Sequence, residues 1–419
     1  MKKYIPKLLF IFLLLQPFLD IAAGISTILN FPNIIGILVR FSFLLFCAWY
    51  SFFLTKNHKK ETRIYLILLA SYLCIFITYT IISKDTSVFF YELQNTMNAF
   101  YFPIIFVAIY QMVEDYNIKI KAKHIAILFT IYLFFVFFPT ITNINLASYA
   151  ISKTGSTGWF NSANSISSIL SLLLPFILIY IRNNKINPII IIITIFIILY
   201  VFFTIGTKVP ILSSAIILTG NIIYYLVYLH KNKKIKQIIL IGITLFIGLG
   251  ISILYIPKTS FYKNIKIHMD YLEIETPLEV LKYPFLIDHF IFSQRLTFLN
   301  RTHNNYIKEN ILTKLIGMGY IENYGADNIN TKTIEMDYFD VFYRHGIIGC
   351  ILFFLPMIYY LKKKHNKFKN SFTHLNITIS VCIIFLLAFF SGHIFLAPAT
   401  STIVTMVLII YDQHNLEET

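Results

Sequence analysis

The sequence has little charge and little cysteine for its length. Of its 419 residues, 13% are Asp, Glu, Lys or Arg, and four are cysteine. Soluble globular chains carry about a quarter charged residues, so this composition excludes an ordinary soluble protein. With 57% hydrophobic residues, the chain has too much apolar surface to stay disordered. All four cysteines lie in apolar stretches, which leaves none for a disulfide framework or a cysteine-rich metal site.

Patterns typical of several other classes of protein are also missing. The chain has no Walker A run, so we expect no ATPase of its own. No period of 20–50 residues and no inverted repeat is visible, which argues against a secondary transporter. The net charge of +15 would suit nucleic acid, but the basic residues are scattered over separate loops rather than gathered in one patch. We therefore expect no nucleic-acid partner.

What the chain has instead is a series of long apolar runs. A helix that crosses the hydrocarbon core needs about 20 mostly apolar residues. The sequence therefore predicts an all-α polytopic membrane protein with about twelve transmembrane helices and one large extracytoplasmic loop. The predicted spans are about 8–28, 33–54, 64–83, 94–113, 125–145, 163–181, 187–205, 209–229, 238–256, 341–361, 377–396 and 399–412.

The distribution of basic residues predicts the orientation of these spans. If the N-terminus is cytoplasmic, the inner segments hold 21 Lys and Arg, and the short outer segments hold only Lys84, Lys153 and Lys208. This asymmetry predicts cytoplasmic N- and C-termini. It divides the chain into transmembrane helices 1–9 at 1–256, a partly helical extracytoplasmic loop at 257–340, and transmembrane helices 10–12 with a cytoplasmic tail at 341–419.

Two ionisable residues fall inside the first two predicted spans. Intramembrane charges are costly and are usually paired or functional. Asp20 and Arg40 lie at matching depth on adjacent antiparallel helices, roughly 11–14 Å below the outer surface. The sequence predicts that they form an ion pair, with a role in locking the two helices favoured over catalysis.

Other polar residues gather near the predicted outer ends of the spans. Asn161 and Asn164 open the sixth span, and Lys208 marks the turn between the seventh and eighth. Each one alone is typical of an interface anchor or a helix cap. Together they suggest a polar cavity that opens outward and binds substrate.

The end of the long outer segment carries a second group of candidates. Glu335, Asp337, Asp340, Arg344 and His345 are concentrated where the chain re-enters the membrane. In a helix, Asp340 and Arg344 would pair at i and i+4, and Arg344 is also a candidate to bind the pyrophosphate or glycan of the substrate. Asp337 is the favoured general base, Glu335 is a further catalytic candidate, and His345 is either a base or an interface anchor. Glu335 and Asp337 without other ligands are a weak metal signal, and we expect no metal site.

Arg295 and Arg301 are the most informative cations of the outer segment. A guanidinium binds phosphate oxygens in a bidentate manner and keeps its charge. An outward-facing enzyme with a lipid pyrophosphate donor needs such a group on its leaving group. A surface arginine with acidic neighbours is the alternative interpretation.

These features together resemble a known family. The patterns are Gln16 to Asp20, Gly158 to Asn164, Gly206 to Lys208, Ser293 to Arg295, Gly317 to Gly319, and Glu335 to Asp340 leading into Gly346 to Gly349. In their order and positions they resemble the O-antigen ligase and Wzy-type O-antigen (capsule) polymerase superfamily, particularly members from Gram-positive bacteria. The resemblance covers nearly the whole chain.

The resemblance implies a GT-C-like glycosyltransferase architecture and an inverting transfer at the outer leaflet of the bacterial cytoplasmic membrane. The implied partners are an undecaprenyl-pyrophosphate-linked glycan donor, a glycan acceptor, membrane lipids and other polysaccharide assembly proteins, and no cofactor is implied. Arg295 matches the family's loop arginine. Lys208 stands where arginine is common and loses the bidentate fork. Asp337 falls near a position where the ligase branch usually has histidine.

Three functions remain open at this point. The favoured one is a polymerase that joins lipid-linked repeat units into a surface polysaccharide. The second is a ligase that moves a finished glycan to a lipid or protein acceptor. The third, of another class, is a lipid-linked glycan flippase or other transporter, which should carry charges along the whole depth of the membrane.

Overall fold

The computed structural model describes residues 4–84, 86–149, 153–184, 186–234, 236, 255–321, 333–363, 371–413 and 416–417. Within these residues, ten helices are long and apolar enough to cross a membrane, and a shorter apolar helix follows near the C-terminus. The all-α polytopic architecture predicted from the sequence is confirmed. The predicted span at 238–256 lies almost entirely outside the described residues.

The apolar helices form one bundle. In chain order they are α1 (Tyr4–Ile28), α2 (Ile34–Trp49, extended by a π turn at Tyr50–Leu54), α3 (Lys59–Ser83), α4 (Phe89–Tyr116), α5 (Ala122–Ile141), α6 (Ala163–Asn183), α7 (Pro188–Ile205), α8 (Lys208–Lys231), α14 (Asp337–Lys363), α15 (Phe372–Phe390) and α16 (Pro398–Gln413). Helices α4 and α6 are largely buried, whereas α7 and α8 are mostly exposed. An apolar helix that exposes most of its surface is suited to contact with lipid.

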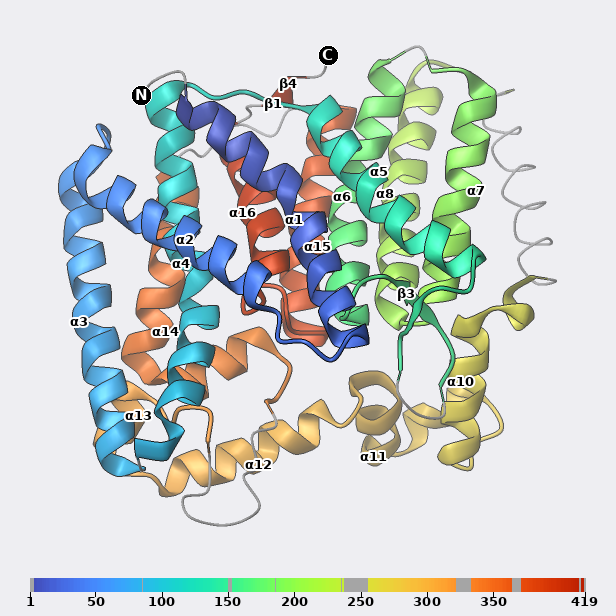
Figure 1. Cartoon of the computed structure of the whole chain (residues 1–419). Coiled ribbons are helices and arrows are strands. Elements are labelled where there is room, and N and C mark those ends of the chain that lie inside the picture. Colours follow the sequence, from blue (N-terminus) through green and yellow to red (C-terminus); the bar gives the residue numbers. More distant parts are fainter. Residues whose placement is uncertain are drawn as a thin grey trace.

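Both chain ends lie at one end of the bundle, and the long polar segment lies at the other (Figure 1). That segment contains α10 (Ser260–Tyr271), α11 (Pro284–Ile287), a π turn at Asp288–Phe292, α12 (Arg295–Lys308) and α13 (Ile311–Ile316). Two-stranded pairings complete the structure. Strand β1 (Ile120–Lys121) pairs in parallel with β4 (Leu416–Glu417), and β2 (Leu146–Ala147) pairs antiparallel with β3 (Ser156–Gly158).

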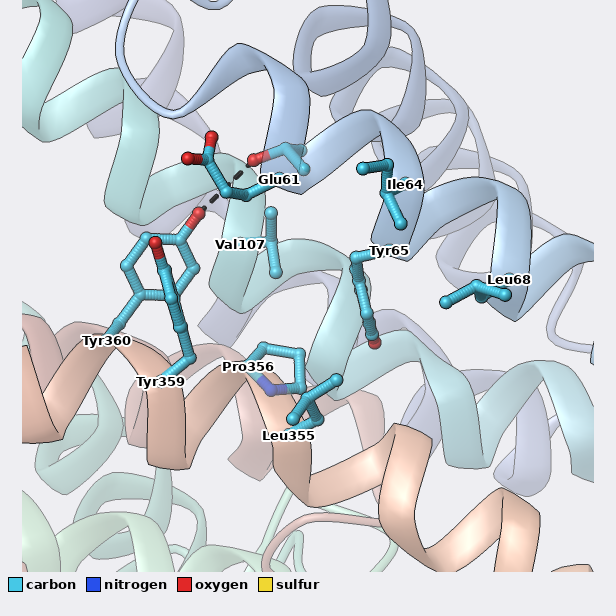
Figure 2. Close-up of a pocket in the computed structure, with 10 residues that line it drawn as sticks. Glu61, Ile64, Tyr65, Leu68, Val107, Leu355, Pro356, Tyr359 and Tyr360 are labelled. Atoms are coloured by element: carbon cyan, nitrogen blue, oxygen red, sulfur yellow. Dashed lines mark hydrogen bonds between the residues drawn. The ribbon is translucent and has the colours of Figure 1, made fainter.

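Prolines inside the helices free carbonyls that other segments satisfy. Proline has no N–H and so leaves the carbonyl four residues earlier without its helical donor. Pro356 frees the Leu352 carbonyl, which accepts a bond of 3.1 Å from the Tyr65 hydroxyl. Figure 2 shows Tyr65 and Pro356 facing the same groove of about 280 Å³ between α3 and α14. In hydrocarbon such a substitute donor is needed, because no water can take its place.

A proline in α5 also helps to seat the segment that precedes α6. Pro139 frees the Phe135 carbonyl, which accepts a bond of 3.2 Å from the Trp159 N–H. Gly158 has φ +65, and any Cβ there or at Gly24 would collide with the backbone of α5 or of Trp159. Glycine is needed where backbones approach this closely. The segment is therefore wedged between α1 and α5.

Candidate functional site

Helix α14 is broken where it enters the bundle. Gly346 has φ 64 and ψ −172, so Asp337 to His345 form a short helix that precedes the long one. The helix begins at Asp337, four residues before the predicted start at about 341, and the break was not foreseen from the sequence. The Tyr72 hydroxyl lies 2.8 Å from the His345 carbonyl and 2.9 Å from that of Ile316. It thus supplies a donor where the helical bonds stop.

The outer segment docks directly onto this short helix. The N–H of Met318 donates to the Tyr343 carbonyl at 3.1 Å, and that of Gly319 donates to the Arg344 carbonyl at 2.9 Å. These backbone bonds satisfy carbonyls at the end of the short helix. They hold the Gly317 to Gly319 turn against the bundle.

Asp337 is buried, and both oxygens of its carboxylate accept hydrogen bonds. It accepts backbone N–H groups from His393 at 2.7 Å, Ile394 at 2.8 Å and Phe395 at 2.7 Å. A general base needs a lone pair within reach of the acceptor hydroxyl. The geometry does not fit the prediction that Asp337 is the base, because its lone pairs hold the turn between α15 and α16.

Asp340 and Arg344 are also buried and serve the local backbone. Asp340 accepts the N–H of Ile334 at 2.9 Å and that of Met336 at 3.1 Å. Arg344 donates to the Gly319 carbonyl at 3.1 Å. The Asp340 carboxylate thus reaches back to the chain entering α14, like the side chain in the first turn of a capping box that accepts the N–H of the N-cap residue. Arg344 supports the docked turn, and the geometry does not place it where it would bind substrate.

His345 is enclosed by aromatic rings. It is fully buried, its Nε2 lies 2.9 Å from the Tyr320 hydroxyl, and its ring packs 4.9 Å from Phe76 and 4.8 Å from Phe100. With the residue fully buried, neither ring nitrogen is open to a substrate in this structure. Neither the catalytic role nor the interface anchoring expected for His345 fits this position.

Arg295 and Glu335 form an ion pair at the bundle surface. Arg295 Nη2 lies 2.9 Å from Glu335 Oε2, and the Glu335 side chain is 33% exposed. The guanidinium also donates to the Phe390 carbonyl at 3.1 Å and to that of Ser391 at 3.3 Å. Glu335 is the most accessible of the predicted acids. It lies beside the cation that was expected to bind pyrophosphate.

Arg295 belongs to a group of basic residues, which we call the cation cluster: the cations Lys153, Lys208 and Arg295 and the neighbouring imidazole of His268. Lys208 is the first residue of α8, and the positive charges of Lys153 and Arg295 act on it. Its ammonium donates to the Phe290 carbonyl and lies 4.5 Å from the centre of the Phe290 ring. The His268 ring stacks on Phe290 at 5.3 Å. Residues far apart in sequence therefore bring positive charge to one place.

The electrostatics of the cation cluster favour an anion. Burial, together with the charges of Lys153, Lys208 and His289, lowers the pKa of His268 to about 4. Burial also lowers the pKa of Lys153. Like charges held together in this way are stabilised by a negative ligand. Sequence reasoning missed Lys153 and His268, although Lys153 was already one of the few outer cations.

The remaining predicted residues lie apart from the cation cluster. Arg301 is exposed on α12, six residues beyond Arg295 and so on a different face of the helix. In the part of the chain that the structure describes, neither Asn161 nor Asn164 contacts Lys208 or Arg295. Asn161 instead lines a cavity of about 160 Å³ together with Asp20 and Tyr132. Asn164 is half-buried in the first turn of α6.

Asp20 and Arg40 join α1 to α2 as expected. Arg40 Nη2 lies 2.5 Å from Asp20 Oδ1, and Arg40 Nε lies 3.2 Å from Gln16 Oε1. The Tyr132 hydroxyl donates to the other Asp20 oxygen at 3.1 Å. Both charges are therefore paired within a hydrogen-bonded group, which is the condition for keeping ions below a membrane surface.

A second buried ion pair was missed. Lys84 Nζ lies 2.6 Å from Glu92 Oε1, with side chains 2% and 1% exposed. Glu92 also accepts the N–H groups of Tyr320 and Ile321 at 2.9 Å. It thereby fastens the outer segment to the start of α4. Among the described residues, no group of three or more His, Cys, Asp or Glu converges as metal ligands would.

The fold and these sites define a multi-pass helical membrane protein with a cation cluster at the end that carries its long polar segment. A family model described as "O-antigen ligase like membrane protein" matches residues 2–282 and 279–415. The chain belongs to this family, which supports a role in glycan transfer at a membrane. No curated protein and no solved structure is similar enough to count as a match.

Proposed function

We propose that the protein is a glycosyltransferase that joins undecaprenyl-pyrophosphate-linked repeat units into a surface polysaccharide. The cation cluster carries this proposal. It combines two lysines with a guanidinium at the bundle end that bears the polar segment. A pyrophosphate leaving group develops negative charge as its bond to the sugar breaks, and fixed cations stabilise that charge. Family membership supports glycan transfer as the reaction.

The reaction itself is an inverting substitution. The acceptor hydroxyl oxygen attacks the anomeric carbon of the donor, and the bond from that carbon to the lipid pyrophosphate breaks. Lys208 and Arg295 hold the departing pyrophosphate, and a base takes the hydroxyl proton. Positioning, a base and leaving-group stabilisation suffice for such a step. The activated sugar arrives on its lipid, so no nucleotide is consumed.

Glu335 is our candidate for the base. It combines partial exposure with direct contact to Arg295, whereas Asp337 and His345 are buried and engaged elsewhere. Donor pyrophosphate and Glu335 compete for the same guanidinium. Binding of the donor to Arg295 therefore releases Oε2 of Glu335, which can then accept the proton.

The proposed location is the bacterial cytoplasmic membrane, with the cation cluster facing outward. The basic residues on the short connections favour cytoplasmic termini, and both termini share one end of the bundle (Figure 1). A polyprenyl donor requires a site at membrane level, and a growing polysaccharide requires outward access. Other polysaccharide assembly proteins are proposed partners on the same side.

The alternative functions differ in testable ways. An O-antigen ligase-type enzyme would make a single transfer of a lipid-linked glycan to a lipid or protein acceptor. A flippase would move the lipid-linked glycan without forming a glycosidic bond. His268 lies in α10 and Arg295 begins α12, and both helices lie at the end of the bundle that carries the polar segment (Figure 1), which favours an enzyme over a flippase.

Reconstitution of the purified protein into vesicles with a lipid-linked repeat unit tests the proposal. A polymerase is expected to give a ladder of lipid-linked products with and without a chelator. A single transferred product would indicate a ligase, and translocation without a new glycosidic bond would indicate a flippase. Either of these results would overturn the polymerase assignment.

A further inference from the structure

A second polar pocket lies away from the cation cluster. It has a volume of about 370 Å³ and is formed between the end of α3 and the α12–α13 region. Figure 1 shows these helices meeting at the end of the bundle that carries the polar segment. The residues that matter for its chemistry are Tyr79, Ser83, Lys84, Asn305, Lys308 and Asn310. No residue of the cation cluster lines it.

The buried wall of this pocket is electrically balanced. The charge of Lys84 is compensated by Glu92 at 2.6 Å. Tyr79 and Thr313 share a hydrogen bond of 2.6 Å between their hydroxyls. The Asn310 side-chain oxygen accepts the Thr313 N–H at 2.8 Å, which leaves its amide NH₂ for a ligand. A site without excess charge does not select a phosphate.

The chemistry of the lining suits a ligand rich in hydroxyl groups. Amides and hydroxyls both donate and accept hydrogen bonds, as sugar hydroxyls do. Tyr79 adds an aromatic side chain to the wall, and Lys308 and Glu309 add neighbouring charges of opposite sign at the rim. A few convergent polar groups in a concave site of this size are typical of a small-ligand site.

Helix α12 connects the pocket to the cation cluster. Arg295 opens α12, and Asn305 lies ten residues further along it. At 1.5 Å per residue the two positions are about 15 Å apart along the helix axis. A ligand in the pocket is therefore remote from the atoms that react at the cation cluster. An extended oligosaccharide is nevertheless long enough to occupy both places at once.

We propose that this pocket is a glycan subsite, which holds one sugar unit of a chain whose reacting end lies at the cation cluster. This inference rests on the proposed function for the identity of the reacting end. Binding energy from such a remote unit holds the chain equally in the ground state and the transition state, so it lowers KM without raising kcat. The sugar belongs either to the acceptor chain or to the repeat unit on the donor.

The subsite is tested by measuring, with saturation-transfer NMR, how the lipid-free repeat-unit oligosaccharide binds to the full-length protein. Asn305→Ala combined with Lys308→Ala removes two polar partners and is expected to weaken binding about tenfold. Ser83→Trp fills the pocket from α3 and is expected to have the same effect. Asn304→Ala is the matched control, because Asn304 is the adjacent asparagine on α12 and does not line the pocket.

Transfer kinetics identify which substrate occupies the pocket. An increase of KM for the acceptor alone assigns the pocket to the acceptor, and an increase for the donor alone assigns it to the donor. In both cases kcat for a single transfer is expected to stay unchanged. If the wild type does not bind the oligosaccharide, or if all the variants bind it equally well, the proposed subsite is refuted even if transfer occurs. Binding that depends on the pocket in a protein without transferase activity overturns the proposed function and leaves the subsite standing.

Discussion

Replacement of Asp337 by asparagine should destabilise the protein rather than remove a catalytic group. One oxygen of Asp337 accepts the N–H of His393, and the other accepts those of Ile394 and Phe395. Asparagine retains one acceptor oxygen. If that oxygen keeps the two bonds, the amide NH₂ faces the third N–H, donor against donor.

The expected cost follows from these contacts. A hydrogen bond to a charged group contributes about 1.5–3 kcal/mol, and a neutral one contributes about 1 kcal/mol. Asp337→Asn loses one bond and weakens two, and relief of the buried charge offsets part of this loss. We expect a net destabilisation of about 2–4 kcal/mol. Asp340→Asn weakens one of two backbone bonds and loses the other, and it also removes a negative charge that acts on the buried Arg344.

The assay compares stability with turnover per folded molecule. Purified variants are heated in detergent, and the folded fraction is measured by size-exclusion chromatography before transfer is assayed. Asp270→Asn, at an exposed position in α10, is the control. Asp337→Asn should have lower stability than the control and near-normal turnover per folded molecule. Unchanged stability with a loss of turnover of about 100-fold or more would refute this reasoning, because that is the effect of removing a general base.

Three further predictions concern other contacts. Arg295→Ala should raise KM for the donor and abolish polymer, with the protein at normal abundance in the membrane. Glu335→Gln should still bind the donor but lose about 10²–10⁴-fold in turnover. Normal polymer length in the arginine variant, or an equal loss of donor affinity in both variants, would contradict the assigned roles. His268 has a pKa of about 4 in the folded protein and near 6.5 in the unfolded chain, so the unfolded chain binds more protons between these values, and stability should fall as the pH falls from about 6.5 to 4. The denaturation midpoint of His268→Gln should depend less on pH over this range. A pH dependence equal to that of the wild type would refute the lowered pKa. Tyr65→Phe should lower the free energy of unfolding, measured by denaturant titration, by about 1 kcal/mol. The loss should be smaller in a protein that also carries Pro356→Ala, because the Leu352 carbonyl then regains its helical N–H donor. An equal loss with and without Pro356→Ala would count against the bond from Tyr65 to the Leu352 carbonyl.

Some side-chain contacts were predictable because simple geometry constrains them. Asp20 and Arg40 sit at equal depth on consecutive antiparallel helices, so their pairing follows from spacing and from the cost of leaving either charge alone. Lys208 and Arg295 stood out because they break the positive-inside pattern. Their proximity depends on how the polar segment returns to the bundle, which sequence spacing does not specify.

The geometry does not support some of the other assignments, for a common reason. Asp337 and His345 have side chains suited to proton transfer, but the structure uses them to hold a turn and to fill an aromatic core. Whether the lone pairs of a carboxylate are taken by backbone N–H groups depends on a segment more than 50 residues away. The ion pair of Lys84 with Glu92 carried a weak sequence signal, since opposite charges eight residues apart flank one outer turn.

The sequence by itself determined the class of protein, since the length and apolarity of its runs admit only membrane-spanning helices. Its residue patterns also led to the family, which the family match supports. The tertiary structure alone decided which polar side chains are accessible. The break at Gly346, the docking of the Gly317 to Gly319 turn and the gathering of the cation cluster all depend on contacts between distant segments. Such contacts set burial, and burial decides whether a carboxylate or an imidazole can meet a substrate.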